Sequence, residues 1–196
     1  MIRSYRPTDH GDVYDVCVRT GNAGGDARGR YVTDDLLGDL WAGPYLELEP
    51  GLAFVVAVPL PEGGERVAGY ILGTADTRGF VERYRREWLP RLTAKYTEDE
   101  DTWAGFHPER MLIPAIDEFP AHLHIDLLPE LQRQGWGRML MRRFLAAAAD
   151  RGAGGAHLSF DPANTGAAAF YDRLGFQPLP SSRPDAPLYG IRIPVG

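Results

Sequence analysis

Apolar residues fall into short runs of two kinds along this chain, and the two kinds predict strands and helices in turn. Runs rich in Val, Ile, Leu, Ala and Tyr, bounded by Gly, Pro or charged residues, are typical of strands. Strands are therefore expected at residues 2–6, 52–58, 66–75, 121–128, 156–160, 176–179 and 189–193. The polar residues 59–65 between the second and third runs indicate a hairpin connection.

Apolar residues spaced three and four apart predict helices between these strands. Thr8 or Asp9 caps the first helix, which ends at Gly21 and Asn22. Further helices are expected at 34–41, 80–96, 135–151 and 164–174. Strands and helices thus alternate, which predicts a mixed α/β layer architecture without internal repeats.

One helix carries an aromatic stripe with arginines between its members. Apolar side chains recur every four residues at Phe80, Tyr84, Trp88, Leu92 and Tyr96. Pro90 is expected to kink or split this helix. A nucleic-acid surface is one interpretation of the pattern. An apolar stripe with this spacing is normally buried in the core, however, and the arginines then form the solvent-exposed face of the helix.

Residues 97–120 are acidic at first and later rich in proline. They predict an irregular insertion folded over a cleft, although a domain linker is the alternative. Because neither flank looks independent, residues 1–196 are expected to form a single domain.

The composition narrows the function classes. The net charge of −6 argues against a nucleic-acid partner, because such affinity rests on Lys and Arg. No apolar run is long enough for a membrane span, and no signal-peptide pattern opens the chain. Cys17 is the only cysteine, so a cytoplasmic location is expected, and its position in a helix predicts a core residue rather than a nucleophile.

The sequence Gln-Arg-Gln-Gly-Trp-Gly at residues 132–137 joins a predicted strand to a predicted helix. The first N–H groups of a helix have no partner within it and attract anions. Gly135 and Gly137 would let a phosphate approach that backbone closely. The alternative is that the two glycines only allow a tight turn.

Two ordered motifs resemble the GNAT superfamily of acyl-CoA-dependent N-acetyltransferases. Gln132, Gly135 and Gly137 fit the Gln/Arg-x-x-Gly-x-Gly/Ala signature that follows the fourth strand of that family. Asn164 and the run from Phe170 to Phe176 match its second block, Asn-x-x-Ala…Phe-Tyr-x-x-x-Gly-Phe. The resemblance implies an α/β fold with a GNAT-like mixed, mostly antiparallel central sheet flanked by helices.

The segments 43–46, 69–76 and 88–90 are similar to a narrower group, the acetyltransferase-like C-terminal domain of eukaryotic O-GlcNAcase. That domain has a disputed activity and a degraded phosphate loop. Since this chain keeps the loop intact, the resemblance implies a free-standing relative that binds its cofactor.

Acetyl-CoA is the cosubstrate that the GNAT resemblance implies, placed in a splay between the strands at 121–128 and 156–160. The residues expected to bind it are Leu127, Leu128, Gln132, Arg133, Gln134, Gly135, Trp136, Gly137, Arg138 and Asn164. For Asn164 the alternative is a helix N-cap.

The resemblance places Tyr171 as the acid for the departing thiolate, with a packed helix aromatic as the alternative. His122, His124 and Asp126 alternate on one strand and so share a face. The His-x-His pattern resembles serotonin N-acetyltransferase, although its spacing to the glycine loop is one residue shorter, which a bulge would absorb. Asp126 or one histidine is expected to take the amine proton.

A His-x-His pair also suggests a metal site, but no third ligand has convincing spacing, and no metal is expected. Tyr45, Tyr70 and Asp76 are expected to line the acceptor pocket. The predicted function is therefore transfer of an acetyl group to an amine, preferably of a small molecule. A CoA-sensing or interaction domain without activity is the main alternative, and a histone-tail modifier is another. The sequence predicts no oligomeric state.

Overall fold

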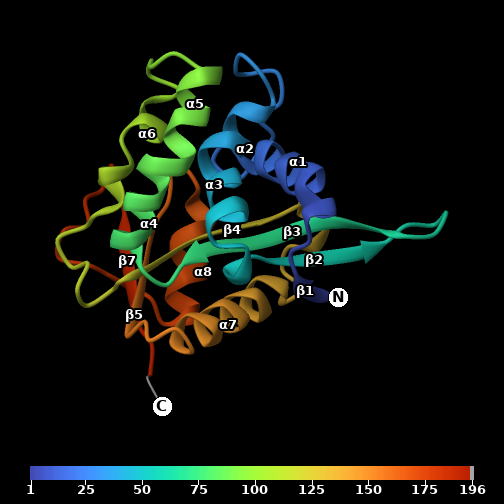
Figure 1. The fold of residues 1–196 in the computed structure, drawn as a ribbon. Helices are drawn as coiled ribbons and strands as arrows, with labels where there is room; N and C mark the ends of the chain where they lie inside the picture. The colour runs from blue at the N-terminus through green and yellow to red at the C-terminus, as the bar shows by residue number, and fades with distance from the viewer. Residues whose placement is uncertain (195–196) are drawn as a thin grey trace.

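Seven strands pair into one open sheet in the computed structural model of this chain, which describes residues 1–194 (Figure 1). The strand order is β1-β2-β3-β4-β5-β7-β6, and only β4 and β5 run parallel. The strands are β1 (Ile2–Ser4), β2 (Phe54–Pro59), β3 (Glu65–Thr74), β4 (Ala121–Leu127), β5 (Gly155–Ser159), β6 (Gln177–Pro178) and β7 (Leu188–Arg192). The predicted mixed, mostly antiparallel α/β sheet is confirmed.

Eight α-helices and several shorter helical turns connect these strands within the described residues. The α-helices are α1 (His10–Thr20), α2 (Asp35–Trp41), α3 (Gly43–Leu48), α4 (Thr77–Arg83), α5 (Leu89–Lys95), α6 (Trp103–Phe106), α7 (Trp136–Ala149) and α8 (Thr165–Leu174). The 3-10 turns are η1 (Pro7–Asp9), η2 (Pro50–Leu52), η4 (Pro108–Met111) and η5 (Pro129–Leu131). Helix α3 was not predicted, and Pro44 in its first turn favours a helix start there.

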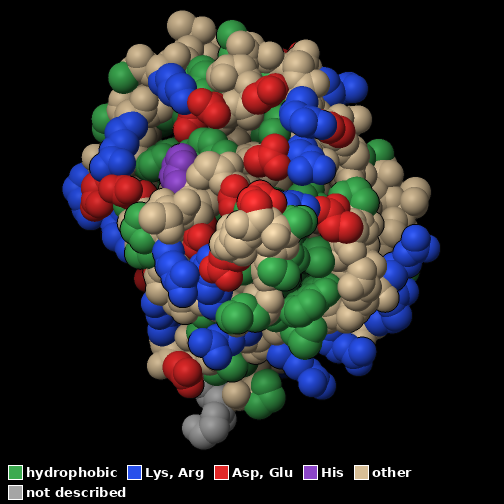
Figure 2. Space-filling model, turned by 90° about the vertical axis from the view of Figure 1, so that its right-hand side faces the viewer, with side chains coloured by type: hydrophobic (Ala, Val, Ile, Leu, Met, Phe, Trp, Pro, Cys, Tyr) green, Lys and Arg blue, Asp and Glu red, His purple; other side chains and the backbone are tan. Residues whose placement is uncertain are grey.

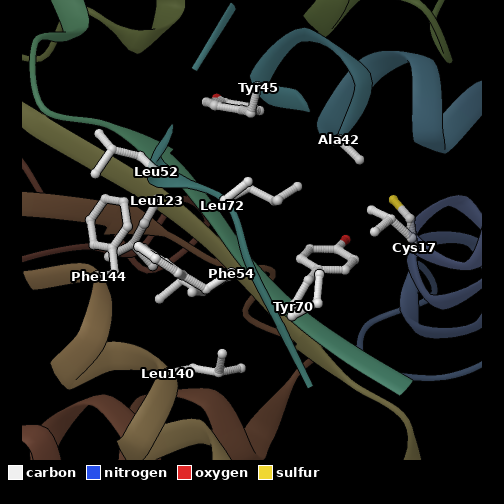
Figure 3. Close-up of a cluster of buried hydrophobic side chains, with 14 of the residues drawn as sticks. Cys17, Ala42, Tyr45, Leu52, Phe54, Tyr70, Leu72, Leu123, Leu140 and Phe144 are labelled. Carbon is white, nitrogen blue, oxygen red and sulfur yellow. The ribbon is translucent and has the colours of Figure 1, made fainter. Parts of the chain in front are cut away.

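The central strands are covered on both faces, which is why their residues are almost all apolar. Cys17 of α1 and Tyr45 of α3 lie on one side of the sheet, and Leu140 and Phe144 of α7 lie on the other (Figure 3). All of these side chains are buried. A Cβ on Gly73 of β3 would lie 2.6 Å from the Phe144 ring, so α7 packs closely on that face.

The predicted aromatic stripe forms, but on a helix of three parts. Phe80, Tyr84, Trp88 and Leu92 are buried, whereas Tyr96 lies beyond the helix end and is only half-buried. The π-helical turn η3 (Tyr84–Trp88) separates α4 from α5. Pro90, in the first turn of α5, has no N–H to donate, which accounts for the change of helical register just before it.

The insertion at residues 97–120 is more ordered than predicted. It contains α6 and η4, and Ile116 and Phe119 are buried. The Met111 sulfur lies 3.6 Å from the Tyr45 hydroxyl, and the Arg110 guanidinium lies over the Trp41 ring. The insertion therefore packs against α2 and α3.

The surface mixes charges of both signs. On the face in Figure 2, basic and acidic side chains are intermixed, and hydrophobic side chains gather in the lower half. Within residues 1–194, no helix combines the length and apolar character that crossing a membrane requires.

Candidate active site

Strands β4 and β5 separate soon after they meet. They pair only at Ala121 with Ala156 and at His122 with His157, while β4 continues along β3 and β5 along β7. The Leu128 N–H donates to Ala68 O, and main-chain groups of an antiparallel strand alternate in direction. The main-chain groups of Ile125 and the N–H of Leu127 therefore point into the opening between the two strands.

Both main-chain groups of Leu128 already have hydrogen-bond partners in the protein. Its N–H donates to Ala68 O, and its carbonyl accepts from the Leu131 N–H at 2.9 Å. Because both groups have protein partners, the predicted contact to the cofactor arm moves from Leu128 to Ile125, with Leu127 retained.

The loop before α7 presents a row of N–H groups. Within residues 1–194, no protein group accepts a hydrogen bond from the N–H groups of residues 133–138. Gly135, the N-cap residue of α7, has a φ of 86°, a left-handed conformation that favours glycine. The free amides and the positive end of the α7 dipole together make an anion site.

The glutamines of this loop hold its shape. Gln132 Nε2 donates to Leu127 O at 3.0 Å, and Gln134 Nε2 donates to Glu130 O. The side-chain amides of both glutamines thus donate to protein carbonyls. For the predicted contact to the cofactor, the main-chain groups of these residues remain. Arg133 and Arg138 are exposed, and neither forms an ion pair with any residue in the described part of the chain.

Packing gives Gly137 a further constraint that the sequence did not predict. A Cβ at this position would lie 2.9 Å from Phe170 Cζ, so the glycine allows α7 and α8 to approach each other. At Gly135, by contrast, no atom lies within 4 Å of the added Cβ. Gly135 therefore shapes the loop, and Gly137 packs the second motif against it.

The second motif brings Asn164 and Tyr171 to the same region. Asn164 occupies the N-cap position of α8, but its side chain forms no capping hydrogen bond, so the N-cap alternative is wrong in that respect. The Tyr171 ring packs among Phe160, Phe170 and Phe176.

Burial raises the pKa of Tyr171, and the charge of Asp126 raises it further. A phenol with a raised pKa keeps its proton. The Tyr171 phenol is therefore better suited to donate a hydrogen bond to the departing sulfur than to transfer its proton to it.

His122, His124 and Asp126 lie along one face of β4, opposite Thr74, Leu72 and Tyr70 of β3. The β3–β4 register runs without a shift, so the predicted bulge in β4 is absent. The sheet irregularity lies instead between Val56 and Ala57 of β2.

Tyr45 joins the two histidines. Its hydroxyl lies 2.7 Å from His122 Nε2 and 3.1 Å from His124 Nε2. The Thr77 hydroxyl donates to Pro120 O and lies 2.7 Å from His122 Nδ1. His122 Nδ1–H then donates to Thr77, Tyr45 donates to His122 Nε2, and His124 Nε2–H donates to Tyr45, an assignment that follows from the partners. It leaves His124 Nδ1 with a free lone pair.

Asp126 is held separately. The Tyr70 hydroxyl donates to Asp126 Oδ2 at 2.7 Å. Burial raises the pKa of Asp126, and the hydrogen bond from the Tyr70 hydroxyl offsets this only in part. A raised pKa makes the carboxylate a stronger base than an exposed aspartate.

The pKa values of both histidines are lowered. Burial lowers the pKa of His124 to about 3, and the charge of Arg110 adds to the effect. Burial also lowers the pKa of His122 well below its ordinary value, with His157 and His124 as further causes. Both rings are neutral at pH 7, so Asp126 is the group in this row best suited to take up a proton.

Tyr45, Tyr70 and Asp76, which were expected to line the acceptor pocket, all form hydrogen bonds within the protein. Tyr45 and Tyr70 are at most 2 % exposed and act as hydrogen-bond partners of the β4 row. The Asp76 carboxylate accepts from the Gly79 N–H at 3.1 Å and caps α4. Sequence reasoning also missed Thr77 and Arg110, because no local motif links them to β4.

Cys17 lies in the core next to this row. Its thiol is buried, and burial raises its pKa to about 12, with the charge of Asp126 as the next cause. The prediction that it is a core residue is confirmed. A thiol with so high a pKa is a poor nucleophile at neutral pH.

Within residues 1–194, no three His, Cys, Asp or Glu side chains lie close enough together to hold a metal ion. The Nε2 atoms of His122 and His124 both face Tyr45. The row is thus arranged as a hydrogen-bond chain.

A cavity of about 680 Å³ lies elsewhere, between α1, α2, α3 and α5. Tyr14, Asp39, Trp88 and Lys95 are among the residues that line it. No predicted catalytic or cofactor residue does, and the Asp39 carboxylate is already bound by Tyr14, Lys95 and Tyr96. The cavity therefore does not belong to the row on β4.

Known proteins resemble this chain in sequence and in fold. The family model described as acetyltransferase (GNAT) family matches residues 28–176. Protein O-GlcNAcase of Rattus norvegicus is 28% identical over 185 residues, which cover 89% of this chain. The same enzyme of Mus musculus matches over the same lengths, and the chain spans about a fifth of the length of these curated relatives.

Among solved structures, that of SsHAT is 43% identical, with a TM-score of 0.88 and coverage of 99% of this chain and 98% of that one. The ribosomal-protein-S18-alanine N-acetyltransferase of Escherichia coli is 17% identical, with a TM-score of 0.53 over 100% and 95% of the two chains. At that identity the second likeness concerns the fold alone.

Proposed function

Because the chain belongs to the acetyltransferase (GNAT) family, we propose that it transfers an acetyl group from acetyl-CoA to an amine acceptor. The observation that carries this proposal is the pairing of two features at one end of β4. The strands β4 and β5 separate there, and the loop that follows β4 presents N–H groups without protein partners.

These features fit the chemistry of coenzyme A. The N–H groups of residues 133–138 would bind its diphosphate, and the guanidinium groups of Arg133 and Arg138 would add charge-assisted contacts. The pantetheine amides would pair with the main chain of Ile125 and Leu127 in the opening. Trp136 and Asn164 lie at the two helix starts that flank this path.

The transfer is a direct attack. The amine nitrogen forms a bond to the thioester carbonyl carbon, and the C–S bond breaks to release the thiolate. Asp126 takes the amine proton, and His124, with its free Nδ1 lone pair, helps to orient the amine. The Tyr171 hydroxyl donates a hydrogen bond to the departing sulfur. Because the corresponding thiol has a pKa of about 8.5, the thiolate leaves readily.

The acceptor that we favour is a small molecule in the cytoplasm. The packing of the insertion against α2 and α3 supports this choice, because it narrows the approach to His124.

A single-turnover assay tests the proposal. Purified protein is mixed with acetyl-CoA and a panel of amines, and the release of free CoA is measured together with acetylated product. Release that depends on an amine supports an acetyltransferase. Tight binding of acetyl-CoA in calorimetry without release from any amine would favour a CoA-sensing domain instead.

A further inference from the structure

Arg110 is an arginine without an acidic partner in a part of the surface where its neighbours have one. Arg78, Arg85 and Arg91 form ion pairs with Asp117, Glu109 and Glu47. Within residues 1–194, no carboxylate lies within ion-pair distance of Arg110. Its one hydrogen bond runs from Nε to Ala104 O at 2.8 Å, so the two Nη groups have no protein acceptor.

The guanidinium of Arg110 is placed beside the acceptor end of the site. Its carbon Cζ lies 4.5 Å from the centre of the Trp41 ring, and that ring lies 5.6 Å from the ring of His124. The next residue, Met111, contacts the Tyr45 hydroxyl. Trp41 thus lies between a free guanidinium and the histidine row on β4.

Arg110 is an exposed residue whose guanidinium lies against the Trp41 ring. Burial lowers the pKa of Arg110, and only the hydroxyls of Tyr45 and Tyr84 act against this. The Tyr84 hydroxyl is itself buried and has no hydrogen-bond partner among the described residues. The Arg110 side chain is nevertheless reached by solvent, which means that a small anion can reach it too.

A guanidinium offers its donors in a planar fork that matches the two oxygens of a carboxylate or a phosphate. At Arg110 the Nε–H donates to Ala104 O, and one face of the planar guanidinium lies over the Trp41 ring. The edge that carries the two Nη groups has no acceptor among the described residues. Arg83, which is half-buried, differs in that its Nη groups bind Leu48 O and Glu49 within the protein.

We propose that Arg110 binds an oxyanion of the acceptor, so that the preferred acceptor joins an amine to a carboxylate or phosphate in one small molecule. The inference rests on the proposed function and names its substrate class. The amine would meet Asp126 and His124, the oxyanion would meet the Nη groups of Arg110, and the Trp41 ring would flank the chain between them. The diphosphate of CoA is not the anion concerned, since its loop follows the other end of β4.

Calorimetry in the presence of saturating CoA tests this binding without requiring turnover. The probes are ω-amino carboxylates, ω-aminoalkyl phosphates and plain alkylamines over a matched series of chain lengths. We expect the wild type to bind at least one anionic series about ten- to a hundredfold more tightly than the matched alkylamine, the range for a charge-assisted contact. The anionic series that binds more tightly shows whether the oxyanion of the acceptor is a carboxylate or a phosphate.

The variant Arg110→Gln should lose this preference, while its affinity for CoA and its thermal unfolding midpoint stay as in the wild type. Arg110→Lys keeps the charge without the fork and should retain part of the preference. Arg78→Gln is the matched control, an exposed arginine paired with the same insertion, and should bind all probes as the wild type does.

Equal binding of all probes to the wild type, or an unchanged preference in Arg110→Gln, would overturn the proposal. So would loss of CoA binding in that variant, because it would assign Arg110 to the cofactor. Failure of the proposed function has a different signature, in which no amine releases CoA although the anion preference is present.

Discussion

The two ends of this site, one proposed for the cofactor and one for the acceptor, are built from different kinds of chemical group. The cofactor end uses main-chain groups from one continuous stretch, β4 and the loop to α7, with Gly135 setting the conformation. The acceptor end uses side chains from α2, α3, α4, the insertion and β4. Under the proposed function, cofactor binding would rest on the backbone, and the choice of acceptor would rest on side chains that can be exchanged without disturbing that binding.

The sharpest way to separate the two ends is Asp126→Asn. This variant keeps the shape of the side chain but removes the base, so turnover should fall about 10²- to 10⁴-fold, the range for general base catalysis. Affinity for acetyl-CoA should not change, which calorimetry can measure alongside steady-state kinetics.

The pH profile adds a second reading of the same residue. Because burial raises the pKa of Asp126, the acidic limb of kcat/KM should lie above the range of an ordinary carboxyl group. His124, with a pKa of about 3, should add no limb between pH 5 and 8. A limb that persists unchanged in Asp126→Asn would assign it to another group.

Gly135→Val breaks the cofactor end. A β-branched residue is strained at a φ of 86°, by about 1–3 kcal/mol, so the loop should shift and the affinity for CoA should fall about tenfold or more. Gly152→Val is the matched control, since Gly152 follows the other end of α7 with a φ of 87° and open space around it. Equal losses of CoA affinity in both variants would mean that only stability had changed.

Tyr45→Phe breaks the acceptor end. Both histidines lose a hydrogen-bond partner, and an unsatisfied buried nitrogen costs about 1–3 kcal/mol of unfolding free energy. We expect turnover to fall about tenfold through misorientation of His124, with no change in CoA affinity. Chemical unfolding and kinetics measured on one preparation check both effects, and a selective loss of CoA binding would contradict the division.

Acidification should weaken the acceptor end first. The pKa of His124 is lowered on folding, so its contribution to stability is present above pH 6.5 and is lost as the pH falls toward about 3. The unfolding free energy should drop by up to about 1.4 kcal/mol per pH unit for this histidine. Urea unfolding of the wild type and His124→Gln between pH 7 and 4.5 should show the smaller slope in the variant.

Tyr171→Phe should have the smallest effect. A thiolate leaves without full protonation, so losing the hydrogen bond from Tyr171 should slow turnover only about threefold to tenfold. A loss of more than a hundredfold would show that the phenol transfers its proton after all.

The same contrast explains what the sequence could predict. The loop at 132–137 and the second motif were found because glycine spacing and strand–helix alternation are local properties. The packing constraint on Gly137 was not predicted, because it comes from Phe170, which is far away in sequence. Helix α3, Thr77 and Arg110 escaped prediction, as did the contact of Tyr45 with the two histidines, because these features depend on contacts between segments that no periodicity connects.

Strand and helix boundaries shifted by a few residues at most elements. The larger misses have physical causes. Pro90 divides a helix that its aromatic period suggested was continuous, and the proline-rich insertion is stabilised by packing on α2 and α3 rather than by local propensity.

A crystal structure with acetyl-CoA tests the central claim most directly. The account predicts the diphosphate within hydrogen-bond distance of the N–H groups of residues 133–138, and the thioester beside Asp126 and Tyr171. Acetyl-CoA bound in the cavity between α1 and α5, or a loop that stays free of ligand at saturating concentration, would contradict it.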